Sequence, residues 1–318
     1  MTEFGIKLMV ELRGPAALID QAVQAEERGL DFVAISDHIH PWLGDHEHSP
    51  FAWSVLGAIA DRTERIGIAT GVTCPTFRYH PAIVAQASAT IATLAEGRFT
   101  LALGAGERLN EHVVAQGWPP VDIRHEMLAD AIEIIRALHG GGFVTHRGTH
   151  LSVEDARVYD LPDGSIPIVV AVSGPASLDL AQACGADGIM AIDPDPSLID
   201  GWADRGGDRS ATWTEVGFAT APTVEEGKAL AHERMRFITP GWKVMAELPN
   251  PVNFDAATAL ITPEQVAAMV PHGPDPEPYV EAVQEFVDAG FDKISFLPVG
   301  DDLDRFFEMV DIVRDRIG

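Results

Sequence analysis

The chain has 318 residues, of which 46% are hydrophobic, so it is long enough for one large domain with a substantial core. Its 48 acidic residues outnumber the 22 basic ones, giving a net charge of −26 that repels phosphate backbones and anionic lipid surfaces. We therefore expect neither nucleic-acid nor membrane binding. The start MTEFGIKLMV lacks a basic leader, no apolar run is long enough to span a bilayer, and two cysteines make no disulfide framework, which predicts a cytoplasmic protein.

Eight short apolar runs alternate with longer amphipathic stretches along the chain. The runs predict strands at 4–10, 31–36, 65–70, 98–104, 166–172, 187–192, 214–220 and 292–298. Each run is almost continuously apolar, as expected of parallel strands that are buried on both faces. Intervening stretches such as 15–29, 81–97 and 124–140 have helical spacing and end in glycine. This alternation predicts a single (β/α)8 barrel domain over residues 1–318.

Two segments interrupt the alternation, at 141–163 and at 239–276. We interpret both as loop insertions, and such insertions commonly shape the substrate site of a barrel.

Polar residues follow several of the predicted strands, where a barrel enzyme carries its active site. SDHIHPW (36–42) follows the second strand, GVTCPTFR (71–78) the third, GAGERLNE (104–111) the fourth and SGP (173–175) the fifth. His38 and His40 form an H-x-H pair, so a metal-dependent hydrolase is one hypothesis, although strands five and six end without histidine.

Other interpretations of these residues stay open. GAGERL begins as G-x-G but has Leu109 at the sixth position, which makes it weak evidence for dinucleotide binding. In an acid–base reading, His38 removes a hydroxyl proton as hydride leaves carbon, Glu107 donates a proton, and Trp42 walls the pocket. A cofactor-binding protein without catalytic activity is a further alternative.

Several segments together resemble the luciferase-like flavin and deazaflavin oxidoreductases, particularly the branch with the F420-dependent glucose-6-phosphate dehydrogenases. The resemblance rests on SDHIHPW, CPTFRYHPA (74–82), GAGERLNE, YDLPDGSIPIVV (159–170) and GADGIMAI (185–192). It implies a luciferase-like TIM barrel that transfers hydride between coenzyme F420, or alternatively FMN, and a small molecule. It also implies a homodimer and no catalytic metal. An FMN-dependent monooxygenase is the alternative function within the same fold.

The resemblance also implies roles for individual residues. His38 matches the catalytic base, Glu107 the acid that protonates the reduced ring, Trp42 a residue that stabilises the intermediate, and Glu11 a pocket carboxylate. The cofactor-binding positions it implies are Asp37, Gly71, Val72, Cys74, Gly106, Glu107, Asn110, Ser173 and Gly174. A cis peptide between Gly71 and Val72 would back the ring, and Cys74 replaces a threonine that contacts the cofactor.

Three departures from the family pattern bear on the substrate. The dehydrogenases hold a sugar phosphate with two lysines and an arginine, and our alignment places Asp195, Ala256 and Met269 at those positions. An acid and two apolar residues do not compensate a buried dianion. We therefore expect a non-phosphorylated alcohol, carbonyl or activated alkene as substrate, and not glucose 6-phosphate.

Overall fold

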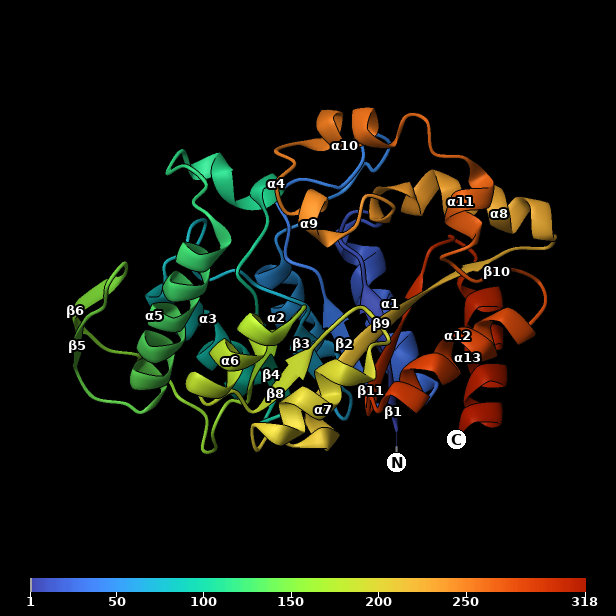
Figure 1. Ribbon diagram of the computed structural model, residues 1–318. Helices are drawn as coiled ribbons and strands as arrows, with labels where there is room; N and C mark the ends of the chain where they lie inside the picture. Colours follow the sequence, from blue (N-terminus) through green and yellow to red (C-terminus); the bar gives the residue numbers. More distant parts are fainter. Residues whose placement is uncertain (1) are drawn as a thin grey trace.

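A computed structural model describes residues 2–318 and shows a closed barrel of eight parallel strands (Figure 1). The barrel strands are β1 Glu3–Leu8, β2 Phe32–Ile35, β3 Gly67–Thr70, β4 Phe99–Leu103, β7 Ile168–Ala171, β8 Gly188–Met190, β9 Thr212–Thr220 and β11 Lys293–Pro298. They pair in chain order, and β1 pairs with β11 and β9 with β8, which closes the ring. All eight predicted strands are confirmed.

Helices surround the barrel on its outer side. They are α1 Pro15–Glu27, α2 Ala52–Arg62, α3 Pro81–Leu94, α5 Val121–His139, α6 Pro175–Ala183, α7 Pro196–Asp204, α8 Val224–Met235, α12 Glu277–Ala289 and α13 Leu303–Ile317. Along β1, Phe4, Ile6 and Leu8 belong to the large core between strands and helices, while Lys7, which alternates with them, is buried on the opposite face of the sheet. This alternation of two buried faces explains why the strands lack a polar-apolar pattern.

A second set of short elements covers the carboxyl ends of the strands, at the top of Figure 1. It comprises α4 Arg108–Glu111, α9 Trp242–Met245, α10 Pro251–Thr258, α11 Pro263–Ala267, the strand β10 His272–Gly273 and single turns of 3-10 helix at His112–Val114 and Arg236–Ile238. A further turn of 3-10 helix, Arg209–Ala211, lies outside this set and precedes β9. The predicted insertion 239–276 supplies most of this cover, and its part in shaping the substrate site stays a prediction.

The other predicted insertion lies elsewhere. Residues 141–163 form an antiparallel hairpin of β5 Val144–Arg147 and β6 Ser152–Ala156 on the outer side of α5 (Figure 1). Asp130 of α5 accepts hydrogen bonds from the backbone N–H groups of His150 and Leu151 at 2.6 and 3.1 Å. The expectation that this segment shapes the substrate site is wrong, because it follows a helix and not a strand end.

No helix within residues 2–318 is both long enough and apolar enough to cross a membrane.

Candidate active site

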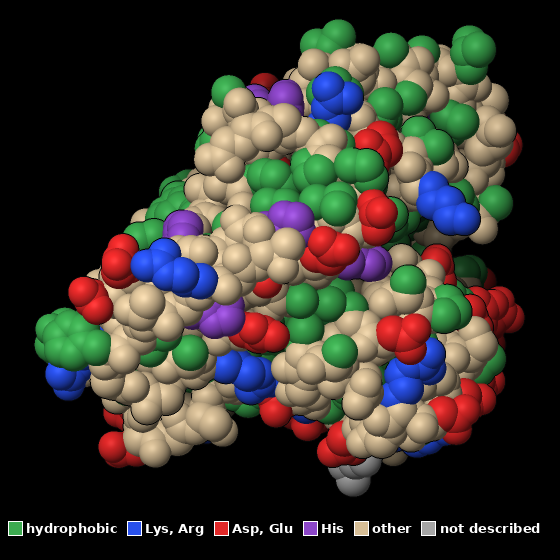
Figure 2. All heavy atoms as spheres, turned by 60° about the vertical axis from the view of Figure 1, so that its left-hand side comes forward, with side chains coloured by type: hydrophobic (Ala, Val, Ile, Leu, Met, Phe, Trp, Pro, Cys, Tyr) green, Lys and Arg blue, Asp and Glu red, His purple; other side chains and the backbone are tan. Residues whose placement is uncertain are grey.

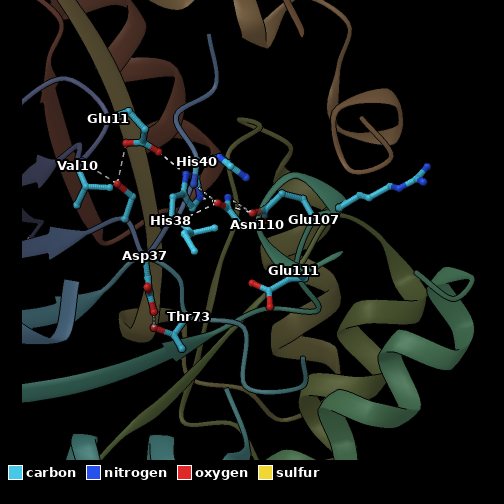
Figure 3. A network of polar contacts seen from close by, with 12 residues as sticks. Val10, Glu11, Asp37, His38, His40, Thr73, Glu107, Asn110 and Glu111 are labelled. Atoms are coloured by element: carbon cyan, nitrogen blue, oxygen red, sulfur yellow. Dashed lines mark hydrogen bonds and ion pairs between the residues drawn. The ribbon is translucent and has the colours of Figure 1, made fainter. Parts of the chain in front are cut away.

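The candidate site lies where the carboxyl ends of β1, β2, β3 and β4 meet. Each strand is followed by a loop that carries polar side chains, and Figure 3 shows Glu11, His38, Thr73 and Glu107 arriving from these four loops. Parallel strands in a closed barrel bring such loops together, although they are far apart in sequence. Figure 2 shows hydrophobic side chains gathered in the middle of one face of the molecule, with histidine and acidic side chains at their border.

The centre of the site is an ion pair between His38 and Glu11. His38 Nδ1 contacts Glu11 Oε1, and the Glu11 side chain is completely buried. Ser36 Oγ donates a 3.0 Å hydrogen bond to Glu11 Oε2. Burial alone would lower the pKa of His38, but the charge of Glu11 and the hydrogen bond to it outweigh burial and raise that pKa above 6.5. Burial acts in the opposite direction on the Glu11 carboxyl, and its pairing with His38 keeps its pKa below the ordinary value.

The second ring nitrogen of His38 faces another carboxylate. His38 Nε2 lies 3.7 Å from Glu107 Oε1, and Asn110 Nδ2 donates to the same oxygen at 2.5 Å. Asn110 Oδ1 in turn accepts from the backbone N–H groups of Ile39 and His40, at 2.8 and 2.9 Å. Asn110 thereby fixes the loop after β2 to the start of α4. The structure thus brings the two residues of the predicted acid–base pair within 3.7 Å of each other.

Trp42 closes one side of this pair. The His38 and Trp42 rings meet edge to face with centroids 4.9 Å apart. Trp42 stacks on Phe237 at 5.0 Å and packs against Phe254 of α10 at 5.3 Å. With Met245 of α9, these rings form an apolar cover over the histidine. Trp42 therefore has a packing role in addition to its predicted place beside the substrate.

Asp37, predicted to contact the cofactor, is heavily engaged by the protein itself. Thr73 Oγ1 donates to its Oδ2 at 2.7 Å, while Arg78 and Tyr79 donate to its Oδ1 at 3.1 and 2.9 Å. The side chain is buried. This arrangement ties the loop after β2 to the loop after β3, and the predicted cofactor contact of Asp37 stays a prediction.

The loop after β4 passes very close to the loop after β3. Gly106 has φ = 76°, and a Cβ there would lie 2.7 Å from Cys74 Sγ and 3.0 Å from Glu111 Cγ. Cys74 Sγ lies 3.2 Å from Thr76 Oγ1, and burial raises the pKa of the thiol well above its ordinary value. A neutral, buried thiol is a packing group and a poor nucleophile.

The remaining predicted cofactor positions also lie at strand ends. The Gly71–Val72 peptide after β3 is cis, in agreement with the expectation, and both residues are half-buried. Ser173 and Gly174 follow β7 and lead into α6, where Ser177 Oγ accepts from both of their backbone N–H groups. Ser173 is exposed at the start of the helix.

His40 does not join His38 in a ligand pair. Burial and the nearby His112 lower the pKa of His40, whereas His38 is paired with Glu11. Across residues 2–318, no three histidine, cysteine, aspartate or glutamate side chains come together as a metal-binding group.

With this geometry in place, comparison with known proteins is informative. Residues 2–293 match the family model described as luciferase-like monooxygenase. The chain belongs to the luciferase-like family. Curated relatives include the F420-dependent glucose-6-phosphate dehydrogenases of Microbacterium testaceum, 37% identical over 96% of this chain and 94% of the relative, and of Nocardia farcinica, 36% identical over 96% and 95%.

Solved structures of the family agree with the fold. An F420-dependent secondary alcohol dehydrogenase in complex with an F420-acetone adduct is 27% identical, covers 98% of both chains and superposes with a TM-score of 0.89. The coenzyme F420-dependent tetrahydromethanopterin reductase of Methanopyrus kandleri, 21% identical over 97% of both chains, has a TM-score of 0.74 and supports the fold alone. The luciferase-like TIM barrel is confirmed.

Sequence reasoning assigned no role to two further residues of this luciferase-like site, the half-buried Arg78 and the buried Glu111. Arg78 donates from its backbone N–H to Glu111 Oε2 at 3.0 Å, and its Nε lies 3.7 Å from Glu111 Oε1. Burial raises the pKa of Glu111 to about 7, with Arg78 opposing and Glu107 adding to the shift. Both residues stand in segments quoted above, CPTFRYHPA and GAGERLNE, and a charged side chain shortly after a strand end was the available signal.

Proposed function

We propose that this protein is a coenzyme F420-dependent oxidoreductase that moves a hydride between the cofactor and a neutral secondary alcohol or ketone. The observation that carries the proposal is the placement of His38 between Glu11 and Glu107 beneath an apolar cover. Curated relatives over 96% of the chain are F420-dependent dehydrogenases, and the solved secondary alcohol dehydrogenase superposes over 98% of it.

The mouth of the barrel fits a flat cofactor that carries a phosphate. Gly104 and Gly106 let the loop after β4 lie close against the loop after β3, since a Cβ at Gly104 would lie 2.8 Å from Val72 Cγ2 and one at Gly106 2.7 Å from Cys74 Sγ. No acidic residue stands in the first turn of α6, which begins after Ser173 and Gly174, so the start of this helix suits an anionic group. A helix end that favours an anion matters here, because the chain as a whole has a net charge of −26 and repels anions.

The side chains of the site divide the acid–base work. Coenzyme F420, when bound, supplies or accepts the hydride. In alcohol oxidation, His38 Nε2 takes the hydroxyl proton and Glu11, at the other ring nitrogen, stabilises the resulting imidazolium. Glu107, held by Asn110, supplies the second proton site on the same side of the pocket. In ketone reduction, the protonated His38 gives its proton to the carbonyl oxygen.

The surroundings favour a substrate without phosphate. Asp195 is exposed and caps α7 by accepting from Ser197 N–H at 2.9 Å, so its carboxylate remains at the surface. Ala256 is exposed on α10, and Met269 is 54% exposed. Trp42 and Phe237 instead offer aromatic surface beside His38. A small neutral ketone matches this surface better than a dianion does.

Purified protein titrated with F420 and with FMN provides the first test, and tight binding of F420 is expected. Rates are then measured with a small secondary alcohol, with acetone and with glucose 6-phosphate. Arg108 and Lys243, exposed at this face, have no carboxylate partner in the part of the chain that the structure describes. An Arg108→Ala variant should therefore leave turnover of the alcohol unchanged. The proposed neutral substrate would be contradicted if glucose 6-phosphate were turned over fast and the Arg108→Ala substitution impaired that turnover. The proposed cofactor would be contradicted if the protein bound FMN alone.

A further inference from the structure

A lysine lies inside the barrel, below the candidate active site. Lys7 of β1 faces the lumen, and its side chain is only 6% exposed. Its ammonium group contacts Glu215 Oε2 of β9 and donates a 2.5 Å hydrogen bond to the carbonyl oxygen of Gly71, after β3. One side chain therefore connects three strands that are not neighbours in the sheet.

Small residues make this reach possible. Lys7 is in register with Ala34 of β2, and Ala34 with Ala69 of β3, so no bulky side chain stands between Lys7 and the end of β3. A Cβ at Gly71 would lie 3.1 Å from Lys7 Nζ and 3.3 Å from the Ala34 Cβ. A larger residue in place of Gly71 or Ala34 would displace the Lys7 ammonium group.

The contact fixes a segment that forms the floor of the barrel mouth. Gly71 N–H donates to Ile35 O at 2.7 Å, and Thr73 N–H donates to Ala102 O at 3.0 Å. Lys7 holds the Gly71 carbonyl between these two anchors, and the next residue, Val72, packs beside Gly104. Gly71 and Val72 are half-buried and the Glu215 side chain is 29% exposed, so all three residues remain partly accessible.

We propose that Lys7 is a positioning residue for the cofactor ring: through Gly71 it fixes the surface on which the ring rests. This inference builds on the proposed function, because it requires a flat ring over Gly71–Val72. Lys7 also places a positive charge below that ring, and Glu215 keeps the charge compensated when no ring is bound.

Fluorescence titration with F420 tests the role without measuring turnover. Lys7→Met removes the ammonium group and should raise the Kd about tenfold, the loss expected for one hydrogen bond from a charged donor. The absorption maximum of the bound cofactor should shift as well, because the charge below it is gone. If Lys7→Met alone does not fold, the double variant with Glu215→Gln leaves no unpaired carboxylate and serves in its place.

Arg98 gives a matched control at the opposite end of the barrel. It also donates to backbone carbonyl oxygens, those of Ile66 at 2.7 Å and Thr63 at 2.9 Å. Arg98→Met should lower the melting temperature and leave the Kd for F420 within twofold. A folded Lys7 variant with unchanged Kd and spectrum would overturn the role of Lys7 while the wild type still binds. Failure of the wild-type protein to bind either F420 or FMN would overturn the proposed function, and with it the support of a ring.

Discussion

The ion pair of Glu11 and His38 predicts a specific effect of Glu11→Gln on the pH dependence of turnover. Alcohol oxidation needs neutral His38, so the rate of the parent enzyme should rise with pH through an inflection above 6.5, where Glu11 holds the pKa of His38. In the variant, burial and the charge of Arg78 lower the pKa of His38 and only the weaker effect of Glu107 opposes them, so the inflection should move to lower pH. Ketone reduction, which needs the protonated ring, should show the opposite limb.

The magnitude follows from the contact that is lost. A hydrogen bond to a charged group contributes about 1.5–3 kcal/mol, so kcat/KM of the variant on its pH-independent plateau should fall about 10- to 150-fold. The assay is kcat/KM for alcohol oxidation across the pH range. Glu247→Gln is the control, because Glu247 forms an ion pair of 3.1 Å with Arg124 and does not contact His38. An inflection that stays in place or moves upward in Glu11→Gln would refute the reasoning.

The same pair affects folding stability. Glu11 has a lowered pKa, so its contribution is lost as the pH falls below 4.5 and through the folded pKa. His38 has a raised pKa, so its contribution is complete below 6.5 and is lost as the pH rises through the folded pKa. Glu11→Gln should therefore lower the free energy of unfolding most between these limits, by about 3 kcal/mol, the order found when one partner of a buried pair is removed. Denaturant titrations at several pH values measure this difference.

Three further substitutions have defined outcomes. Because the pKa of Glu111 is raised from 4.5 to about 7, its ionisation costs about 3 kcal/mol, so the stability of the parent should fall as the pH rises from 4.5 to about 7; Glu111→Gln should lack that fall. Gly106→Ala should unfold more easily and bind F420 more weakly than Gly97→Ala, since both have positive φ but only Gly106 has atoms within 4 Å of a new Cβ; equal effects would contradict the close approach. Phe237→Leu, which loses the stacking on Trp42, should raise KM for the alcohol more than it lowers kcat, and steady-state kinetics can separate the two.

The candidate site was predictable as a set of positions because the barrel imposes it. Once eight strands are recognised, the residues after each strand end must converge on one face. The strands were recognisable because both faces are buried, which makes each run nearly continuous in apolar residues. SDHIHPW and GAGERLNE therefore contain His38, Trp42, Glu107 and Asn110, which the structure brings together; their roles stay predictions.

The motifs did not indicate which residue each side chain would contact. Asp37 pairs with Arg78 and Tyr79, and Lys7 with Glu215 and Gly71, through contacts between strands that are distant in sequence. The hairpin at 141–163 was misplaced for the same reason, since its packing on α5 depends on long-range contacts.

The sequence by itself determined the barrel, its order of strands and the chemical types present at its mouth, because these follow from local periodicity and chain connectivity. Only the tertiary structure decided that His38 shares its two nitrogens between Glu11 and Glu107, and that Lys7 crosses the lumen to the end of β3. Burial and charge pairing depend on three-dimensional proximity, and that proximity is set when the ring of strands closes.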